Sequence, residues 1–359
     1  MPNENDDIDV EQKQHLQKNV QDIVNLMNLD IDTSDKPPKN LSEASIEWYG
    51  HETLRITGGK NVILYGVPGS GKSYTIKTEY CKDTKYMERV VFHPDYTYSD
   101  FVGQILPLSE GDKVSYPFIP GPFTKIMKKA WRNPSKMFYL VIEEINRGNA
   151  PAIFGDIFQL LDRDNKGWGQ YYIYNADMSH EIFPESKEDM PIQIPSNLSI
   201  LATMNTSDQN VFTLDNAFQR RWKMRLIRND FNENKQIQHD NHIKHLIKDT
   251  DITWGSFAKL INSQIAINSR EMIGAEDKRL GVFFATDAEL DDRDDFAEKV
   301  LKYLWDDAFK MDRSAIFLDS LLTFEDLIDA YTNAKGNPIK AVFLDNIYNG
   351  MNPSMADKE

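Results

Sequence analysis

One short run of the sequence has the residue types and spacing of a phosphate-binding loop. It consists of Gly66, Val67, Pro68, Gly69, Ser70, Gly71, Lys72 and Ser73, with Tyr74 directly after it. The run matches G-x-x-x-x-G-K-[ST], whose glycines let successive backbone N–H groups point toward phosphate oxygens. Lys72 would neutralise the β- and γ-phosphates, and the Ser73 hydroxyl would bind Mg²⁺. The run therefore predicts a nucleoside-triphosphate site in which residues 66–74 bind the nucleotide.

Two adjacent acids end an apolar segment further along the chain. Leu140-Val-Ile leads directly into Glu143 and Glu144. Acids at the end of a buried strand beside a phosphate loop are what Mg²⁺-dependent triphosphate hydrolysis requires. We expect Glu143 to hold Mg²⁺ together with Ser73, and Glu144 to polarise the attacking water. The first acid is usually Asp in such sites, so Glu143 must reach the metal with a longer side chain.

Polar groups also follow a second apolar segment, 198–205. Asn205 ends that segment, and Asp208 closes the run Met-Asn-Thr-Ser-Asp. A polar side chain there can contact the γ-phosphate and the attacking water. Arg220 and Arg221 are adjacent at the end of the helix expected next, where they suit an arginine finger. The alternative is a pair of surface arginines in salt bridges.

The segments that must position these groups alternate between expected strands and helices. Strands are expected at 61–65, 90–94, 137–144 and 198–205, and helices at 72–81, 123–131 and 150–162. Strands that are apolar on both faces and alternate with helices indicate a parallel α/β sheet. Aromatic residues alternate within 165–195, which predicts a hairpin or an insertion there.

The sequence after residue 228 has a different pattern from the part that contains the motifs. After residue 228 the expected strands stop, and helices are expected at 251–270, 294–311 and 323–331, the last with Thr323 as its N-cap. The predicted organisation has three parts. These are an acidic N-terminal helix and linker (1–40), a nucleotide-binding α/β domain (41–228) and a helical lid or C-terminal domain (229–359).

Composition excludes several classes of protein. The 359 residues include 41 Lys+Arg and 56 Asp+Glu, a net charge of −15, so a global basic footprint for nucleic acid is absent, although a local basic groove stays open. The single cysteine, Cys81, cannot form an intrachain disulfide. No apolar run approaches the ~20 residues that span a bilayer, and the acidic N-terminus is unlike a signal peptide. We expect a soluble, cytoplasmic protein without a membrane partner.

Together these motifs resemble the AAA+ family, and their details are similar to its McrB branch. The similar segments are HPDYTYSDFVGQILP (93–107), IEEINRGNAPAIFGDIFQLLD (142–162), IPSNLSILATMNTSD (194–208) and LDNAFQRRW (214–222). The resemblance implies an AAA+ P-loop fold, a parallel sheet flanked by helices and followed by a helical lid. It also implies a Mg²⁺-dependent GTPase, with ATP as the other possible substrate. The family works as a hexameric ring with an McrC-type endonuclease, which implies that this chain reaches DNA through partners.

The resemblance also assigns roles by position. It implies that Glu144 is the catalytic acid, that Asn205 is the sensor residue and that Asp208 positions nucleotide or water. Asn146 and Arg147 match the family's I-N-R-G run at the subunit boundary. In the lid, Lys278 is placed near the phosphates or the interface. Residues 1–40 leave no room for the DNA-reading domain of longer members, so recognition of methylated DNA is not carried over.

Two other interpretations stay open at this point. One is an ATP-dependent remodelling factor of the MoxR or dynein-like AAA+ groups, acting on protein partners. The other is a scaffold that switches with nucleotide but does not hydrolyse it. The runs M-N-T-S-D and I-N-R-G favour the McrB branch over the first, and Glu144, Asn205 and the arginine pair argue against the second.

Overall fold

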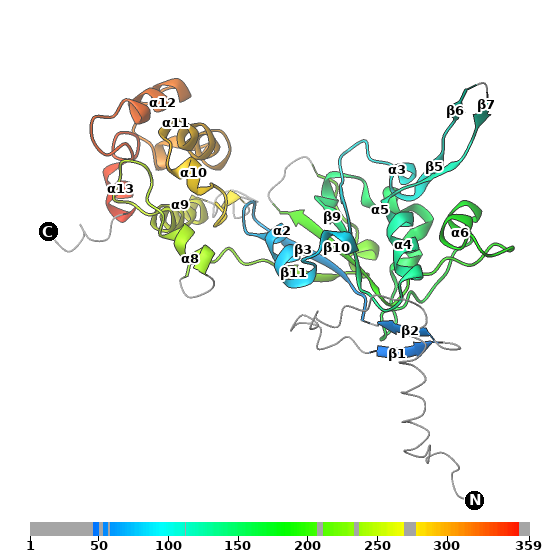
Figure 1. Ribbon diagram of the computed structural model, residues 1–359. Coiled ribbons are helices and arrows are strands. Elements are labelled where there is room, and N and C mark those ends of the chain that lie inside the picture. The colour runs from blue at the N-terminus through cyan, green and yellow to red at the C-terminus, as the bar shows by residue number, and fades with distance from the viewer. Residues whose placement is uncertain are drawn as a thin grey trace, which may run out of the picture. The chain divides into compact units, whose positions relative to one another are not determined.

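The computed structural model describes most of the chain beyond residue 45 (Figure 1). The described ranges are 46–49, 53–56, 58–111, 113–206, 211–232, 237–268 and 278–351. All of them lie in one compact unit, Glu43–Glu359. The helix expected within 1–40 and its linker lie outside the described residues. In the ranges given, no helix is long and apolar enough to cross a membrane.

A five-stranded sheet carries the predicted site. Its strands are β3 (Asn61–Gly66), β4 (Met87–Val91), β9 (Phe138–Glu143), β10 (Leu198–Asn205) and β11 (Lys223–Leu226). They lie in the order β11-β3-β10-β9-β4, and every neighbouring pair is parallel (Figure 1). The carboxyl ends of all five strands therefore meet at one edge. This confirms the predicted parallel α/β fold.

Both edge strands differ from the sequence prediction. β4 lies three residues before the expected 90–94, and the fully buried Phe92 follows its last residue. β11 was not predicted, since its sequence, KMRL, is half charged. An edge strand has one neighbouring strand and is incompletely covered, so it tolerates polar side chains. Its sequence then lacks the apolar run by which a buried strand is predicted.

Buried apolar side chains cover both faces of the sheet. On one face Ile63, Ile142 and Ile200 pack with helices α4 (Pro122–Arg132) and α5 (Ala150–Phe154), the latter continuing as a 3₁₀ turn, Gly155–Leu161. On the other face the apolar side chains pack against the π-helical turn Ile76–Tyr80, which continues α2 (Lys72–Thr75), and against Cys81. Burial raises the pKa of the Cys81 thiol to about 11, so it stays protonated at neutral pH.

The aromatic segment 165–195 is an insertion and not a hairpin. It contains helix α6 (Ala176–Ile182), and one isolated bridge, Ile173↔Ile192, joins its two sides. The Asn175 side chain accepts a hydrogen bond from the N–H of Met178 at 3.0 Å and so starts the helix. The capped helix forms here in place of the paired strands that the alternating pattern would give in a hairpin.

Several short elements were not predicted from sequence. Three antiparallel ribbons pair β1 (Ile46–Tyr49) with β2 (Thr53–Ile56), β5 (Gly103–Ile105) with β8 (Phe118–Pro120), and β6 (Leu108–Glu110) with β7 (Lys113–Ser115). The short helix α3 (Tyr98–Val102) was likewise not predicted, whereas α7 (Asn216–Gln219) is the helix expected before Arg220 and Arg221. Strands of three or four residues leave too short a pattern to distinguish them from loops.

The part after residue 228 is helical, as expected. Its helices are α8 (Ile237–Ile243), α9 (Trp254–Asn268), α10 (Asp287–Leu290), α11 (Arg293–Phe296), α12 (Phe324–Thr332) and α13 (Asp345–Met351). π-helical turns at Ala297–Leu301 and Leu304–Ala308 follow α11. Thr323 caps α12 in a reciprocal box with Asp326, which confirms the predicted N-cap. These helices enclose a core of their own, which runs from Phe231 to Met351.

Candidate active site

The phosphate loop joins β3 to α2 at the carboxyl edge of the sheet. Gly69 and Gly71 have φ angles of 73° and 92°, in the left-handed region that residues with a side chain rarely adopt. The buried Lys72 ammonium donates to the carbonyl oxygens of Gly66 at 2.9 Å and Val67 at 3.0 Å. These contacts place the predicted cation inside the loop.

Glu143 lies where a metal-binding acid is required. Its carboxylate accepts hydrogen bonds from the hydroxyls of Ser73 (3.1 Å) and Thr203 and forms an ion pair with Arg89 (2.8 Å). The longer side chain therefore reaches the serine that the sequence paired with it. A hydroxyl and a carboxylate are hard oxygen donors of the type that Mg²⁺ prefers, so the residues present fit this ion.

Glu144 is oriented by backbone strain and by three neighbours. Its φ of 54° is left-handed, which is uncommon for a residue with a side chain. Its N–H donates to Thr203 Oγ1 at 3.1 Å, and its carboxylate accepts from Asn205 Nδ2 at 2.7 Å and lies 3.7 Å from Arg147 Nε. Asn146 supports the same group by donating to the Asn205 carbonyl oxygen at 3.0 Å. The predicted catalytic acid and sensor thus lie in direct contact.

A pocket of about 720 Å³ opens over these groups. Its first side is formed by residues 68–74, Glu144 and Asn205. Its second side comes from the segment after β11 and from the helical part, and includes Ile227, Arg228, Asp230, His239, Val282 and Phe283. The volume lies in the range of small-molecule and cofactor sites. The predicted catalytic groups and the second side therefore surround one space that can hold a nucleotide.

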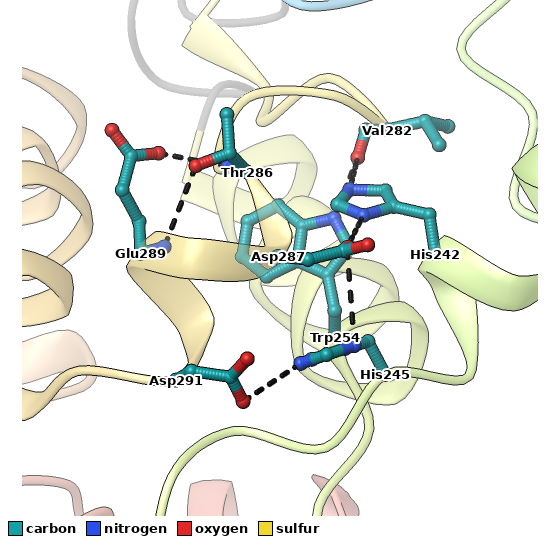
Figure 2. Close-up of polar contacts among 8 residues, drawn as sticks. All are labelled: His242, His245, Trp254, Val282, Thr286, Asp287, Glu289 and Asp291. Atoms are coloured by element: carbon teal, nitrogen blue, oxygen red, sulfur yellow. Dashed lines mark hydrogen bonds and ion pairs between the residues drawn. The ribbon is translucent and has the colours of Figure 1, made fainter.

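The loop Leu280–Phe284, here called the lid loop, connects the helical part to the phosphate loop. The Phe283 N–H donates to the Gly69 carbonyl oxygen at 2.8 Å. Figure 2 shows how the lid loop is held: the Val282 carbonyl oxygen accepts from Trp254 Nε1 at 2.6 Å and from His242 Nε2 at 2.9 Å. The second ring nitrogen of His242 is bound by Asp287. Helices α8, α9 and α10 therefore position one wall of the pocket.

A Gly281→Ala variant should bind nucleotide at least roughly fivefold more weakly, since one hydrogen bond contributes about 1 kcal/mol. A Cβ at position 281 would lie 2.1 Å from the Pro68 carbonyl oxygen, so the lid loop must move away from Gly69. Titration with a fluorescent triphosphate measures the affinity. Gly336→Ala is the matched control, because its Cβ meets nothing within 4 Å. Equal affinities in the two variants would contradict the role of the contact.

The two predicted finger residues have different surroundings. Arg221 is bound to Asp162 at 2.9 Å, donates to the Ala217 carbonyl oxygen at 2.7 Å and stacks over the Phe158 ring at 4.0 Å. The Arg220 side chain is exposed. Neither arginine lines the nucleotide pocket; both line a separate cleft of about 530 Å³. Within this chain, Arg221 is held in place and Arg220 faces outward.

Two further predicted site residues remain to be placed. Asp208 lies outside the described residues. Lys278 does not line the pocket, and its ammonium donates to the Asp307 carbonyl oxygen at 2.8 Å in the helical part. Conversely, sequence reasoning missed Thr203 and Arg89. Thr203 could have been found, since it lies two residues before Asn205 on a strand and must share its face.

Comparison with known proteins places these features in a family. The family model for the AAA domain (dynein-related subfamily) matches residues 61–222. The BsuMI component YdiS, a type II restriction enzyme component of Bacillus subtilis strain 168, is 36% identical over 299 residues, covering 76% of this chain and 85% of that protein. The EcoKMcrB subunit, a type IV methyl-directed restriction enzyme of Escherichia coli K12, is 29% identical over 175 residues, 47% of this chain and 35% of that protein. With a phosphate loop, paired acids and an asparagine hydrogen-bonded to the second acid on a five-stranded parallel sheet, the chain belongs to the McrB-like AAA+ family of nucleotide-hydrolysing enzymes.

Proposed function

We propose that this chain is the GTP-hydrolysing motor of a restriction system, that it works as a ring and that it drives a separate McrC-like endonuclease. One observation carries the catalytic part of the proposal. Ser73, Glu143, Glu144 and Asn205 come from three different segments and meet at the carboxyl edge of one sheet. The restriction-system context is supported by the names of the two relatives. DNA would be reached through partners, because the chain is acidic overall.

The residues divide the hydrolysis reaction among them. The loop N–H groups and Lys72 hold the β- and γ-phosphates, and Ser73 with Glu143 would hold Mg²⁺, which when bound neutralises charge on the phosphates. Glu144 accepts the proton of the attacking water and orients it in line with the γ-phosphate. Asn205, already hydrogen-bonded to Glu144, fixes the direction of that carboxylate.

Assembly into a ring, expected to be a hexamer, would complete each site. Arg220 lies outside the pocket of its own chain, beside Lys60 and Lys223 in the second cleft. That position suits a finger that reaches the γ-phosphate bound by a neighbouring subunit. Asn146 and Arg147, which support Glu144, would then connect the subunit boundary to the catalytic acid.

The proposed domain division follows the two sets of buried side chains. The clusters on the sheet contain no buried residue beyond Trp222, whereas the helical cluster begins at Phe231. This supports a nucleotide-binding domain over 41–228 and a lid or C-terminal domain over 229–359. The role of residues 1–40 would lie outside catalysis, since no catalytic motif falls there.

One observation favours a second candidate function. The matching family model is described by its dynein-related subfamily, whose name suits an ATP-dependent factor that remodels protein partners. Steady-state hydrolysis of GTP and ATP at matched concentrations, with and without a co-purified endonuclease, separates the two. A GTP rate above the ATP rate supports the restriction motor, and an ATP rate well above the GTP rate supports the remodelling factor.

A Lys72→Ala variant should lose triphosphate affinity by roughly 10- to 150-fold, because a hydrogen bond to a charged group contributes about 1.5–3 kcal/mol. Lys72 is the only side-chain cation among residues 66–74. Nucleotide-dependent assembly should be lost with it. Titration of a labelled triphosphate and sedimentation in its presence measure the two effects. Wild-type affinity in this variant would remove residues 66–74 from nucleotide binding.

A further inference from the structure

Three carboxylates among the described residues line the nucleotide pocket, and the chemistry derived above uses one of them. Glu144 lies on the phosphate side against Asn205. Glu79 is neutralised by Arg225, whose guanidinium lies 2.6 Å from it. The third, Asp230, lies on the segment that leaves β11 for the helical part. It belongs to the second side of the pocket, and the hydrolysis chemistry described above does not use it.

Asp230 is fixed in place by local hydrogen bonds. Its Oδ1 accepts from the N–H of Asn232 at 2.9 Å. Its carbonyl oxygen accepts from His239 Nε2 at 2.8 Å, which ties this segment to helix α8. The other nitrogen of His239 faces Asp240 Oδ1 at 3.1 Å. The Asp230 carboxylate therefore belongs to a preorganised part of the pocket wall.

The surroundings of Asp230 suit a flat, polar-edged ring. Phe283 lines the same wall, and its ring centroid lies 6.2 Å from that of His239 at an interplanar angle of 76°. Ile227 adds an aliphatic surface, and the exposed Arg228 adds a cation. An apolar and aromatic surface with a carboxylate and a guanidinium beside it can stack a purine and bind its edge.

We propose that Asp230 reads the base of the bound nucleotide and selects guanine over adenine; this rests on the proposed GTP-hydrolysing function. Guanine presents two donors side by side, N1–H and the N2 amino group, and a carboxylate accepts from both. Adenine presents an acceptor at N1, whose lone pair the carboxylate repels. Arg228 can donate to the guanine O6, whereas the adenine N6 amino group would face it with a second donor. One acid and one cation thus match guanine and oppose adenine.

The test is an Asp230→Asn variant, assayed for kcat/KM with GTP, ATP and xanthosine triphosphate beside the wild-type protein. The amide oxygen keeps the contact to the Asn232 N–H, so folding should be preserved, and Tm checks this. The amide retains one acceptor and gains a donor, which fits the O2 carbonyl that xanthine carries in place of the guanine amino group. We expect kcat/KM to fall at least ~10-fold for GTP and to rise at least ~10-fold for xanthosine triphosphate.

Asp240→Asn is the matched control, because Asp240 also contacts His239 but does not line the pocket. It should leave the order of the three substrates as in the wild type. If the wild type prefers GTP but Asp230→Asn keeps the wild-type ratios, the assignment of Asp230 is overturned and the GTPase function stands. If the wild type prefers ATP, the proposed GTP preference and the guanine-selecting role of Asp230 fail together.

Discussion

A Glu144→Gln variant should bind nucleoside triphosphate with near-wild-type affinity and turn it over ~10²–10⁴-fold more slowly, the range for loss of a general base. The amide keeps an oxygen to accept from Asn205 Nδ2, which now lies 2.7 Å from the carboxylate. It therefore preserves the geometry while removing the group that accepts a proton from water. Single-turnover hydrolysis with a labelled γ-phosphate measures the chemical step apart from binding.

The neighbouring acid should respond differently. Glu143 lies against the hydroxyls of Ser73 and Thr203 and against Arg89, so Glu143→Gln should raise the Mg²⁺ concentration needed for half-maximal rate. A magnesium titration of both variants separates the two roles. If Glu143→Gln loses turnover at an unchanged magnesium requirement while Glu144→Gln is close to wild type, the order of roles is reversed.

The parts of the fold that the sequence predicts well are those that are buried on both faces. Strand β10 begins and ends at the predicted residues, 198 and 205, and β3 and β9 agree within one residue at each end. Edge strand β11 was missed because solvent on one side removes the need for an apolar sequence. Segment 165–195 was predicted as a hairpin or an insertion, and the alternating pattern alone could not show the helix that the Asn175 side chain caps within it.

The site divides in the same way between local and long-range features. The phosphate loop, the two acids and Asn205 are encoded within short runs, each following a strand, so spacing alone identifies them. Arg89 and Thr203 contact Glu143 across 54 and 60 residues of sequence. The alternation of faces along a strand links Thr203 to Asn205, but no local pattern marks Arg89. Asp230 can be recognised as a pocket residue only from the structure, because the pocket is formed jointly by the sheet and the helical part.

An Arg220→Ala variant should lose ~10³–10⁵-fold in turnover, the contribution of an arginine finger, with its Tm unchanged. The Arg220 side chain is exposed, so its removal leaves the fold intact. Arg221→Ala should instead lower Tm, because it breaks the ion pair with Asp162 and the stacking on Phe158. Lys223→Ala, which removes a positive charge from the same cleft, should stay close to wild type in both measurements.

Mixing two inactive variants tests whether Arg220 acts on a neighbouring subunit. In a ring of Glu144→Gln and Arg220→Ala subunits, an Arg220→Ala subunit keeps an intact phosphate loop and Glu144. A Glu144→Gln neighbour supplies the intact Arg220. Boundaries of that kind hold every group that the reaction needs, so a 1:1 mixture should recover up to about a quarter of wild-type activity if subunits mix at random and sites act independently. Native mass spectrometry establishes that the rings are mixed. Mixed rings without recovered activity would show that Arg220 does not act across the subunit boundary, and a fully active Arg220→Ala protein would remove it from the reaction.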